Sequence, residues 1–286
     1  LQAEASFLKI HPSKKVGRYS GRQKDEEYDF LFASIQTIGQ SSHLAKFPVT
    51  AFDYIVVDEF HHAAAGGYQR LLEHFTPSFL LGLTATPNRT DGSDILELCD
   101  NNLIYQQDLF DGIKADVLCP FSYFGIFDKE VDYEHLPWRN GKFDPEKLSN
   151  KLATKGRAKH VFTEWKSKSQ DVSLAFCVSS KHADYMADYF NQQGVAAASV
   201  HSDSSLTRSE ALEKLNNGEI KILFSVDLFN EGVDLPKIDT VLMLRPTESK
   251  ILFLQQMGRG LRKSEEKDRL IILDFVGNHH SFLNRP

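Results

Sequence analysis

The chain has 286 residues, of which 41% are hydrophobic and 25% charged; this composition is typical of one or two folded domains and excludes an intrinsically disordered protein. Its net charge of −6 argues against a protein that binds nucleic acid over its whole surface. The sequence has no run of eighteen apolar residues that would predict a membrane span, and its three widely spaced cysteines form no metal-binding pair and are typical of a reducing cytoplasm.

Short apolar runs in the first third of the chain predict buried strands. They lie at residues 30–35, 54–58 and 79–83, and their content of Val, Ile, Leu and Phe without polar alternation is typical of central parallel strands. Such strands need helices on both faces of their sheet, so this part of the chain indicates α/β architecture with right-handed crossovers.

A second series of strand and helix patterns follows an aromatic stretch, marked by Pro and Gly, at about residues 121–165. Gly194 and Gly218 each follow a helical pattern, at the position where a left-handed helix cap is expected. The patterns predict strands at 172–178, 195–200, 220–226, 239–244 and 269–275, and helices at 181–193 and 206–217. We therefore expect two α/β domains, at residues 1–118 and 161–286, with an inter-domain connection at 119–160.

The sequence DYIVVDEFHH, residues 53–62, places Asp58 and Glu59 at the end of a predicted strand. Ligands of open parallel sheets bind beyond the carboxyl ends of the strands. One carboxylate there can hold the water shell of Mg²⁺ on a nucleotide phosphate, and its neighbour can orient or deprotonate an attacking water. An acid pair alone is a weak signal, because it is more often part of a solvated loop.

Three further stretches strengthen the interpretation because they follow in a fixed order. GLTATP (82–87) carries two hydroxyls after a strand, and SVDLFNEGVDLP (225–236) carries a glycine between acids. QQMGRGLRK (255–263) spaces Arg259 and Arg262 three residues apart, which predicts that both lie on one helical face.

Together these stretches resemble the motifs of superfamily-two helicases of the D-E-x-H (DEAD/DEAH-box) type. DEFH resembles the D-E-x-H motif, TAT the hydroxyl motif, EGVDLP the fifth motif and QQMGRGLR the pattern Q-x-x-G-R-x-x-R. The resemblance is strongest to the bacterial group related to type I and type III restriction motor subunits. It extends over nearly the whole chain, through FASIQT (32–37), FCVSSKHA (176–183), LRPTES (244–249) and LDFVGN (273–278).

The resemblance implies two RecA-like domains with ATP and Mg²⁺ in the cleft between them and a nucleic-acid strand, DNA rather than RNA, across both. It assigns Mg²⁺ support through water to Asp58, the hydrolytic water to Glu59, and domain coupling to His61, Thr84 and Thr86. Expected near the nucleotide are Gly232, Asp234, Gln255, Arg259 and Arg262, with Arg262 as the arginine finger. Expected strand contacts are Gln36, Thr37, Ser179, His182 and Ser225. A motor with both domains in one chain is expected to be monomeric, without membrane association.

Two departures from the family pattern bear on the site. Val226 occupies the place of the usual threonine before the first acid of the fifth motif, and Ser225 precedes it. The chain contains no G-x-x-x-x-G-K-[ST] loop, whose amides and lysine would cradle the phosphates. We therefore expect a fragment that begins after its own P-loop and that does not hydrolyse ATP alone.

Two other interpretations compete with the motor. Asp58, Glu59, His61 and His62 could form a metal-dependent hydrolase or nuclease site, although adjacent histidines on a strand point to opposite faces and no H-E-x-x-H occurs. Alternatively, the chain could be a non-catalytic module derived from a helicase, which binds nucleic acid or a partner. The missing loop favours this module, whereas the arginine motif argues against it, because a motor without hydrolysis has no use for an arginine finger.

Residues 139–168 form a basic stretch, with nine basic and three acidic side chains in a chain that is otherwise acidic. Lys147, Lys151 and Lys155 recur every four residues, so a single helix would align them on one face, where they repel by about 0.2–0.5 kcal/mol per pair. We expect this face to contact nucleic-acid phosphates near the domain junction. A solvated helix face is the alternative.

Overall fold

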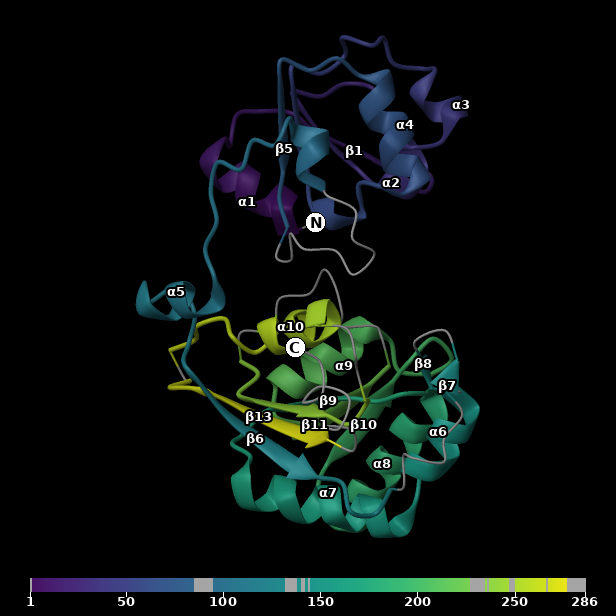
Figure 1. Cartoon of the computed structure of the whole chain (residues 1–286), viewed down its shortest axis with the longest axis vertical. Coiled ribbons are helices and arrows are strands. Elements are labelled where there is room, and N and C mark those ends of the chain that lie inside the picture. Colours follow the sequence, from purple (N-terminus) through teal and green to yellow (C-terminus); the bar gives the residue numbers. More distant parts are fainter. Residues whose placement is uncertain are drawn as a thin grey trace. The chain divides into compact units, whose positions relative to one another are not determined.

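The computed structural model describes residues 2–84, 95–131, 138–139, 142–143, 145–226, 235, 237–246, 250–265 and 267–276. The chain divides into two units, Leu1–Gln106 and Gln107–Pro286, and each is described by itself (Figure 1). Residues 107–160, expected to end the first domain and connect it to the second, thus lie in the second unit. In the described ranges, no helix is long and apolar enough to cross a membrane.

The first unit contains two small sheets and several short helices. β1 (Val16–Ser20) pairs in parallel with β3 (Phe30–Ala33) and antiparallel with β2 (Gln23–Lys24), and β4 (Tyr54–Val57) pairs in parallel with β5 (Phe79–Gly82). The helical segments are α1 (Gln2–Ile10), α2 (Ile35–Ile38), α3 (Ser41–Leu44), α4 (Gly66–His74) and the 3₁₀ turns η1 (Phe60–His62) and η2 (Ile95–Cys99). A buried cluster beneath α2, α3 and α4 consists of Tyr19, Ile38, Leu44, Leu71 and Phe75.

The second unit is built on a six-stranded parallel sheet with the strand order β10-β11-β9-β12-β13-β6. Its strands are β6 (Phe121–Phe127), β9 (Ser173–Phe176), β10 (Ala197–Val200), β11 (Ile222–Ser225), β12 (Thr240–Met243) and β13 (Leu270–Val276). In β9, Leu174 and Phe176 pack into one hydrophobic cluster and Ala175 into another. This two-sided burial explains the continuous apolar runs of the sequence.

Helices cover both faces of this sheet (Figure 1). One layer contains Val161 and Phe190 from α7 and α8, and the opposite layer contains Leu215 and Met257 from α9 and α10. The helices of the unit are α5 (Leu109–Lys114), α6 (Pro145–Leu152), α7 (Lys155–Lys168), α8 (Ser180–Gln192), α9 (Arg208–Asn216) and α10 (Lys250–Gly258), and the short strands β7 (Trp138–Arg139) and β8 (Lys142–Phe143) form a separate pair. Gly194 and Gly218, which follow α8 and α9, have φ values of 81° and 74°, as the sequence predicts.

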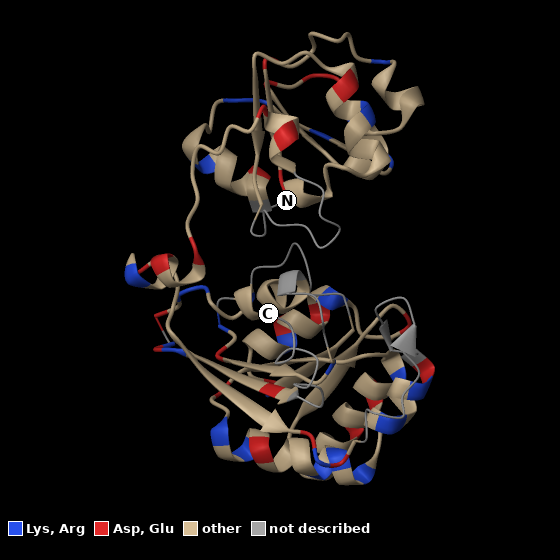
Figure 2. Ribbon diagram, viewed as in Figure 1, with Lys and Arg blue, Asp and Glu red and all other residues tan. Residues whose placement is uncertain are grey.

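The prediction that one helix aligns Lys147, Lys151 and Lys155 is wrong. α6 carries the first two lysines, whereas α7 begins at Lys155 because the Thr154 hydroxyl caps it by accepting the backbone N–H of Arg157 at 3.4 Å. Figure 2 shows basic residues along both helices. The three lysines therefore belong to two helices, and the expected i, i+4 repulsion applies only to the pair within α6.

Candidate functional site

The acid pair lies in a tight turn after β4, as the sequence predicts. Backbone hydrogen bonds join this turn to the end of β5: the N–H of Leu83 donates to Val57 O (2.9 Å), and the N–H of Phe60 donates to Leu83 O (2.8 Å). Asp58 is exposed, and its Oδ1 accepts the N–H of Glu59 at 2.9 Å. The parallel pairing of β4 and β5 thus brings the ends of two predicted motifs together.

Glu59 adopts a left-handed backbone conformation, with φ 51° and ψ 46°. The other non-glycine residues with positive φ in the described ranges are Asp or Asn, which tolerate this conformation. For other L-residues, such as Glu59, the left-handed conformation costs about 1–2 kcal/mol. The ring of Phe60 packs so closely on Gly82 that a Cβ at Gly82 would lie 2.5 Å from it. The turn is therefore enforced by its surroundings, as strained residues at functional sites commonly are.

His61 links the acid pair to the hydroxyl motif. Its ring is buried, and its Nδ1 lies 3.0 Å from Thr84 Oγ1 and 3.3 Å from Glu59 Oε2. Three predicted residues from two motifs thus form one cluster, while Thr86 lies outside the described residues. Within the described part of the chain, no three His, Cys, Asp or Glu side chains are placed to hold a metal ion.

The arginine motif lies beyond the end of its helix. α10 ends at Gly258, and the N–H of Gly260 donates to Met257 O at 3.0 Å. Arg262 is exposed and pairs with Leu118 in an isolated antiparallel bridge. The expected common helical face for the two arginines is therefore wrong, because the chain turns away from the helix at the two glycines.

The remaining nucleotide candidates of the second unit are only partly described. Gln255 lies half-buried within α10, and Arg259 is half-buried directly after it. Gly232 and Asp234 lie outside the described residues.

His182, an expected strand contact, is fully buried in a polar cluster of unit 2. The Arg157 guanidinium donates to His182 Nε2 (3.0 Å), to Leu244 O (3.0 Å) and to Asp128 Oδ2 (2.7 Å). Burial, and then the neighbouring Arg157, hold the pKa of His182 well below its ordinary value, so the ring is neutral and accepts this hydrogen bond. His182 thus holds core elements together rather than lying at the surface of the unit.

The two serines proposed as strand contacts differ in their surroundings. The Ser179 hydroxyl caps α8 by accepting the N–H of His182 (3.1 Å), and it lies 2.5 Å from Ser149 Oγ. Ser225, at the carboxyl end of β11, is fully buried, and within the described residues its hydroxyl has no hydrogen-bond partner.

In the first unit, Gln36 and Thr37 both lie in the short helix α2 after β3. Gln36 is exposed, whereas Thr37 is buried and its Oγ1 accepts the N–H of Gly21 at 3.1 Å. Of these two residues, therefore, Gln36 is the one whose side chain is exposed at the surface of this unit.

Sequence reasoning missed a histidine at the carboxyl edge of the six-stranded sheet of unit 2. His201 follows β10 directly, and its Nε2 lies 3.0 Å from Asp184 Oδ1, which also accepts the Ser199 hydroxyl at 2.5 Å. A polar residue directly after a predicted strand is the signal that could have found it. The buried Lys267, which contacts the arginine motif, gave no such signal.

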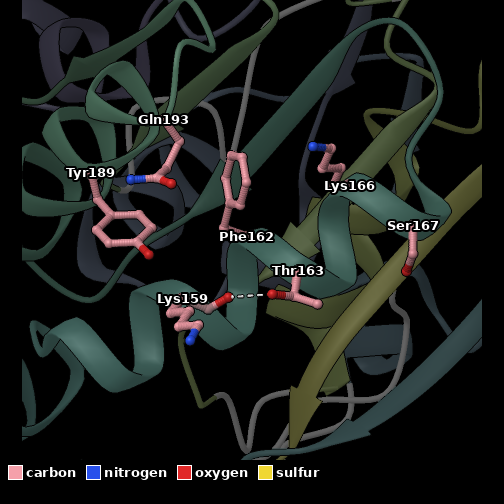
Figure 3. Close-up of a pocket in the computed structure, with 7 residues that line it drawn as sticks. All are labelled: Lys159, Phe162, Thr163, Lys166, Ser167, Tyr189 and Gln193. Carbon is pink, nitrogen blue, oxygen red and sulfur yellow. Dashed lines mark hydrogen bonds between the residues drawn. The ribbon is translucent and has the colours of Figure 1, made fainter.

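A surface hollow of about 430 Å³ lies between α7 and α8 (Figure 3). It is lined by Lys159, Phe162, Thr163, Lys166, Ser167, Tyr189 and Gln193. None of the candidate site residues lines this hollow, so it is a feature separate from the candidate site.

Two families match separate parts of the chain. Residues 1–89 match the family described as type III restriction enzyme, res subunit, and residues 155–264 match the helicase conserved C-terminal domain. The chain is 31% identical over 290 residues to IRC3 of Saccharomyces cerevisiae, which is named as an ATP-dependent helicase. That match covers 97% of this chain and 42% of IRC3.

Solved structures confirm the expected fold of two RecA-like α/β domains. A fragment of a type I restriction enzyme HsdR subunit from Vibrio vulnificus is 28% identical, with a TM-score of 0.71 over 95% of this chain and 52% of that chain. The DNA-bound type ISP restriction-modification enzyme LlaBIII shares the fold, with 17% identity and a TM-score of 0.59 over 87% of this chain and 20% of its own. The chain thus spans about half the length, or less, of these proteins.

Proposed function

Because the chain belongs to the superfamily-two helicases, in the group related to type I and type III restriction motor subunits, we propose that it forms the motor part of an ATP-dependent helicase or translocase. The observation that carries this proposal is the cluster in which His61 contacts both Glu59 and Thr84. It joins the acid pair to the hydroxyl motif, and the Glu59 carboxylate, carried by a strained backbone after a parallel strand, is positioned to orient a water.

The residues after β4 fit a magnesium–nucleotide ligand. Mg²⁺ keeps most of its water and takes few protein carboxylates, and the exposed Asp58 offers one at the end of the strand. We assign the hydrolytic water to Glu59 and the charge that develops on the γ-phosphate to Arg259 and Arg262. Arg262 is the arginine finger in this assignment, and such a finger raises a rate by about 10³–10⁵.

We further propose that the substrate is DNA. The relatives that favour it are the restriction-enzyme subunits, among them LlaBIII, which is bound to DNA in its solved structure. Strand contacts are assigned to the exposed Gln36 and to Lys147, Lys151 and Lys155 in the basic stretch.

Hydrolysis also needs a phosphate-binding loop, and these 286 residues contain no G-x-x-x-x-G-K-[ST]. We propose that the chain alone has no ATPase activity above background and that hydrolysis belongs to a protein that also carries this loop. In such a protein the arginines and the acid pair would take part in hydrolysis, whereas a non-catalytic module would have no role for them.

The test is nucleic-acid-stimulated ATP hydrolysis by the complete gene product that contains this chain. Glu59→Gln should lower kcat by about 10²–10⁴, as expected when a catalytic base is removed, and Arg262→Ala by about 10³ or more. Glu213→Gln, an exposed carboxylate on α9, is the matched control and should leave the rate unchanged. Turnover that survives Glu59→Gln, or turnover by the 286 residues alone, would refute the assignment. Stimulation by RNA but not by DNA would refute the substrate.

A further inference from the structure

Lys267 is a buried lysine that contacts the arginine segment, residues 259–262, without belonging to it. Its side chain is 7% exposed, and its ammonium group donates to Gly260 O at 2.8 Å and to Ile238 O at 3.0 Å. Burial lowers the pKa of Lys267, and the nearby Cys119 and Asp239 partly oppose this shift. A buried ammonium group is costly without hydrogen bonds, and the two carbonyls that it contacts stabilise it in this position.

The two carbonyls belong to segments that carry different motifs. Gly260 lies between Arg259 and Arg262, and Ile238 follows the fifth-motif sequence EGVDLP (231–236). These segments are separated in the chain by α10 and its flanking residues, and one ammonium group contacts the backbones of both. Lys267 therefore links the arginine segment to the residues that lead into β12, directly after the fifth motif.

The arginine segment depends on tertiary contacts because α10 ends before it. The backbone N–H of Cys119 donates to Leu261 O at 2.8 Å, and the Cys119 thiol lies 3.5 Å from Gly260 O. Leu270 packs against Gly260 so closely that a Cβ there would lie 2.3 Å from it. Among these contacts Lys267 supplies the charge-assisted hydrogen bond, which is the stronger kind.

We propose that Lys267 is a positioning residue for ATP hydrolysis: its two backbone contacts hold the arginine segment where Arg259 and Arg262 reach the nucleotide. This inference rests on the proposed function. It assigns Lys267 no contact with ATP, so its loss should affect the chemical step more than nucleotide binding. A misplacement of about 1 Å in a catalytic group can lower a rate by about 100-fold.

The first test separates kcat from nucleotide affinity in the complete gene product. Lys267→Met should lower kcat about 10- to 100-fold while the Kd for a non-hydrolysable ATP analogue changes less than about threefold. Lys267→Arg, which keeps the charge and the donors, should restore a large part of kcat. Lys263→Met removes the exposed lysine that directly follows the segment and pairs with Asp116 at 2.5 Å, and it should leave both quantities unchanged.

The second test follows the segment itself by hydrogen–deuterium exchange of the 286-residue chain. Amides of residues 259–262 should exchange faster in Lys267→Met, while those of β9 and β11 keep their protection. General loss of protection across the sheet would overturn a local positioning role and assign Lys267 to overall stability.

The outcomes distinguish this inference from the function on which it rests. If the wild type hydrolyses ATP and Arg262→Ala does not, but Lys267→Met retains kcat, the positioning role alone is overturned. If the complete gene product does not hydrolyse ATP, both are overturned.

Discussion

Replacing Arg157 by methionine would test the buried polar cluster of unit 2. The side chains of Arg157 and Asp128 are both 0% exposed, and the change removes hydrogen bonds to Asp128, His182 and the carbonyl of Leu244. Methionine fills most of the space of the aliphatic stem, so the main loss is electrostatic. Removing one partner of a buried ion pair costs about 3–5 kcal/mol, because the other charge stays in the core. We expect the free energy of unfolding of unit 2 to fall by this amount.

Tryptophan fluorescence during urea unfolding measures this unit selectively. The chain has two tryptophans, Trp138 and Trp165, and both belong to unit 2. Lys159→Met changes an exposed basic residue of the same helix and should alter the unfolding free energy by less than about 0.5 kcal/mol.

A double variant refines the argument about the ion pair. Combining Arg157→Met with Asp128→Leu should recover part of the lost stability, because a buried apolar pair avoids the cost of desolvating charges. A loss below about 1 kcal/mol for Arg157→Met would refute the reasoning. A double variant less stable than the single one would refute the electrostatic explanation.

Two further predictions concern pH and salt. The pKa of His182 is lowered in the folded state. Below pH 6.5, the ordinary pKa of histidine, the unfolded chain therefore binds a proton at His182 that the folded chain does not bind. The free energy of unfolding of unit 2 should therefore fall as the pH decreases below that value, by up to about 1.4 kcal/mol per pH unit. His182→Gln should remove this part of the pH dependence, as measured by urea titrations at several pH values. An equal pH dependence in both proteins would contradict the prediction. Replacing Lys147, Lys151 and Lys155 by Gln in the complete gene product should lower the log–log salt slope of nucleic-acid binding by up to about 2–3. An unchanged slope with intact folding would assign the basic stretch to a solvated surface.

The strands that the sequence predicts include β9, β11 and β12, which are buried on both faces, whereas β4 and β5, predicted as buried central strands, leave Tyr54, Val56 and Phe79 exposed in a two-stranded sheet. All eight expected strands are present, because continuous apolar runs such as residues 220–226 leave the chain few alternatives to a central strand. The sequence missed β1, whose residues VGRYS mix polar and apolar side chains. It also missed β6, whose aromatic residues resemble a connection and which becomes a strand by pairing with β13.

The site was predictable where its chemistry lies next to a strand, and unpredictable where it depends on distant contacts. Asp58, Glu59 and Thr84 are the first or second residues after β4 and β5, so the parallel pairing of these strands brings them together. Arg157 lies in the basic stretch, whose composition predicts surface charge, although three partners from distant parts of the chain enclose it. Periodicity carries no information about such long-range partners.

β6 lies at the edge of the six-stranded sheet and is the first of its strands along the chain. The chain arrives from the first unit through residues 107–120 and enters the sheet as β6, which is in register with β13 from Phe121 opposite Leu270 to Phe127 opposite Val276. Tension along the chain therefore reaches the contacts of Leu118 with Arg262 and of Cys119 with Leu261 first, and this ladder next. Where the pull lies along the strand, the hydrogen bonds of the parallel pair are sheared together rather than opened one at a time. With seven residues, β6 is longer than the four-residue strands β9 to β12, so its ladder with β13 resists such a pull over its whole length.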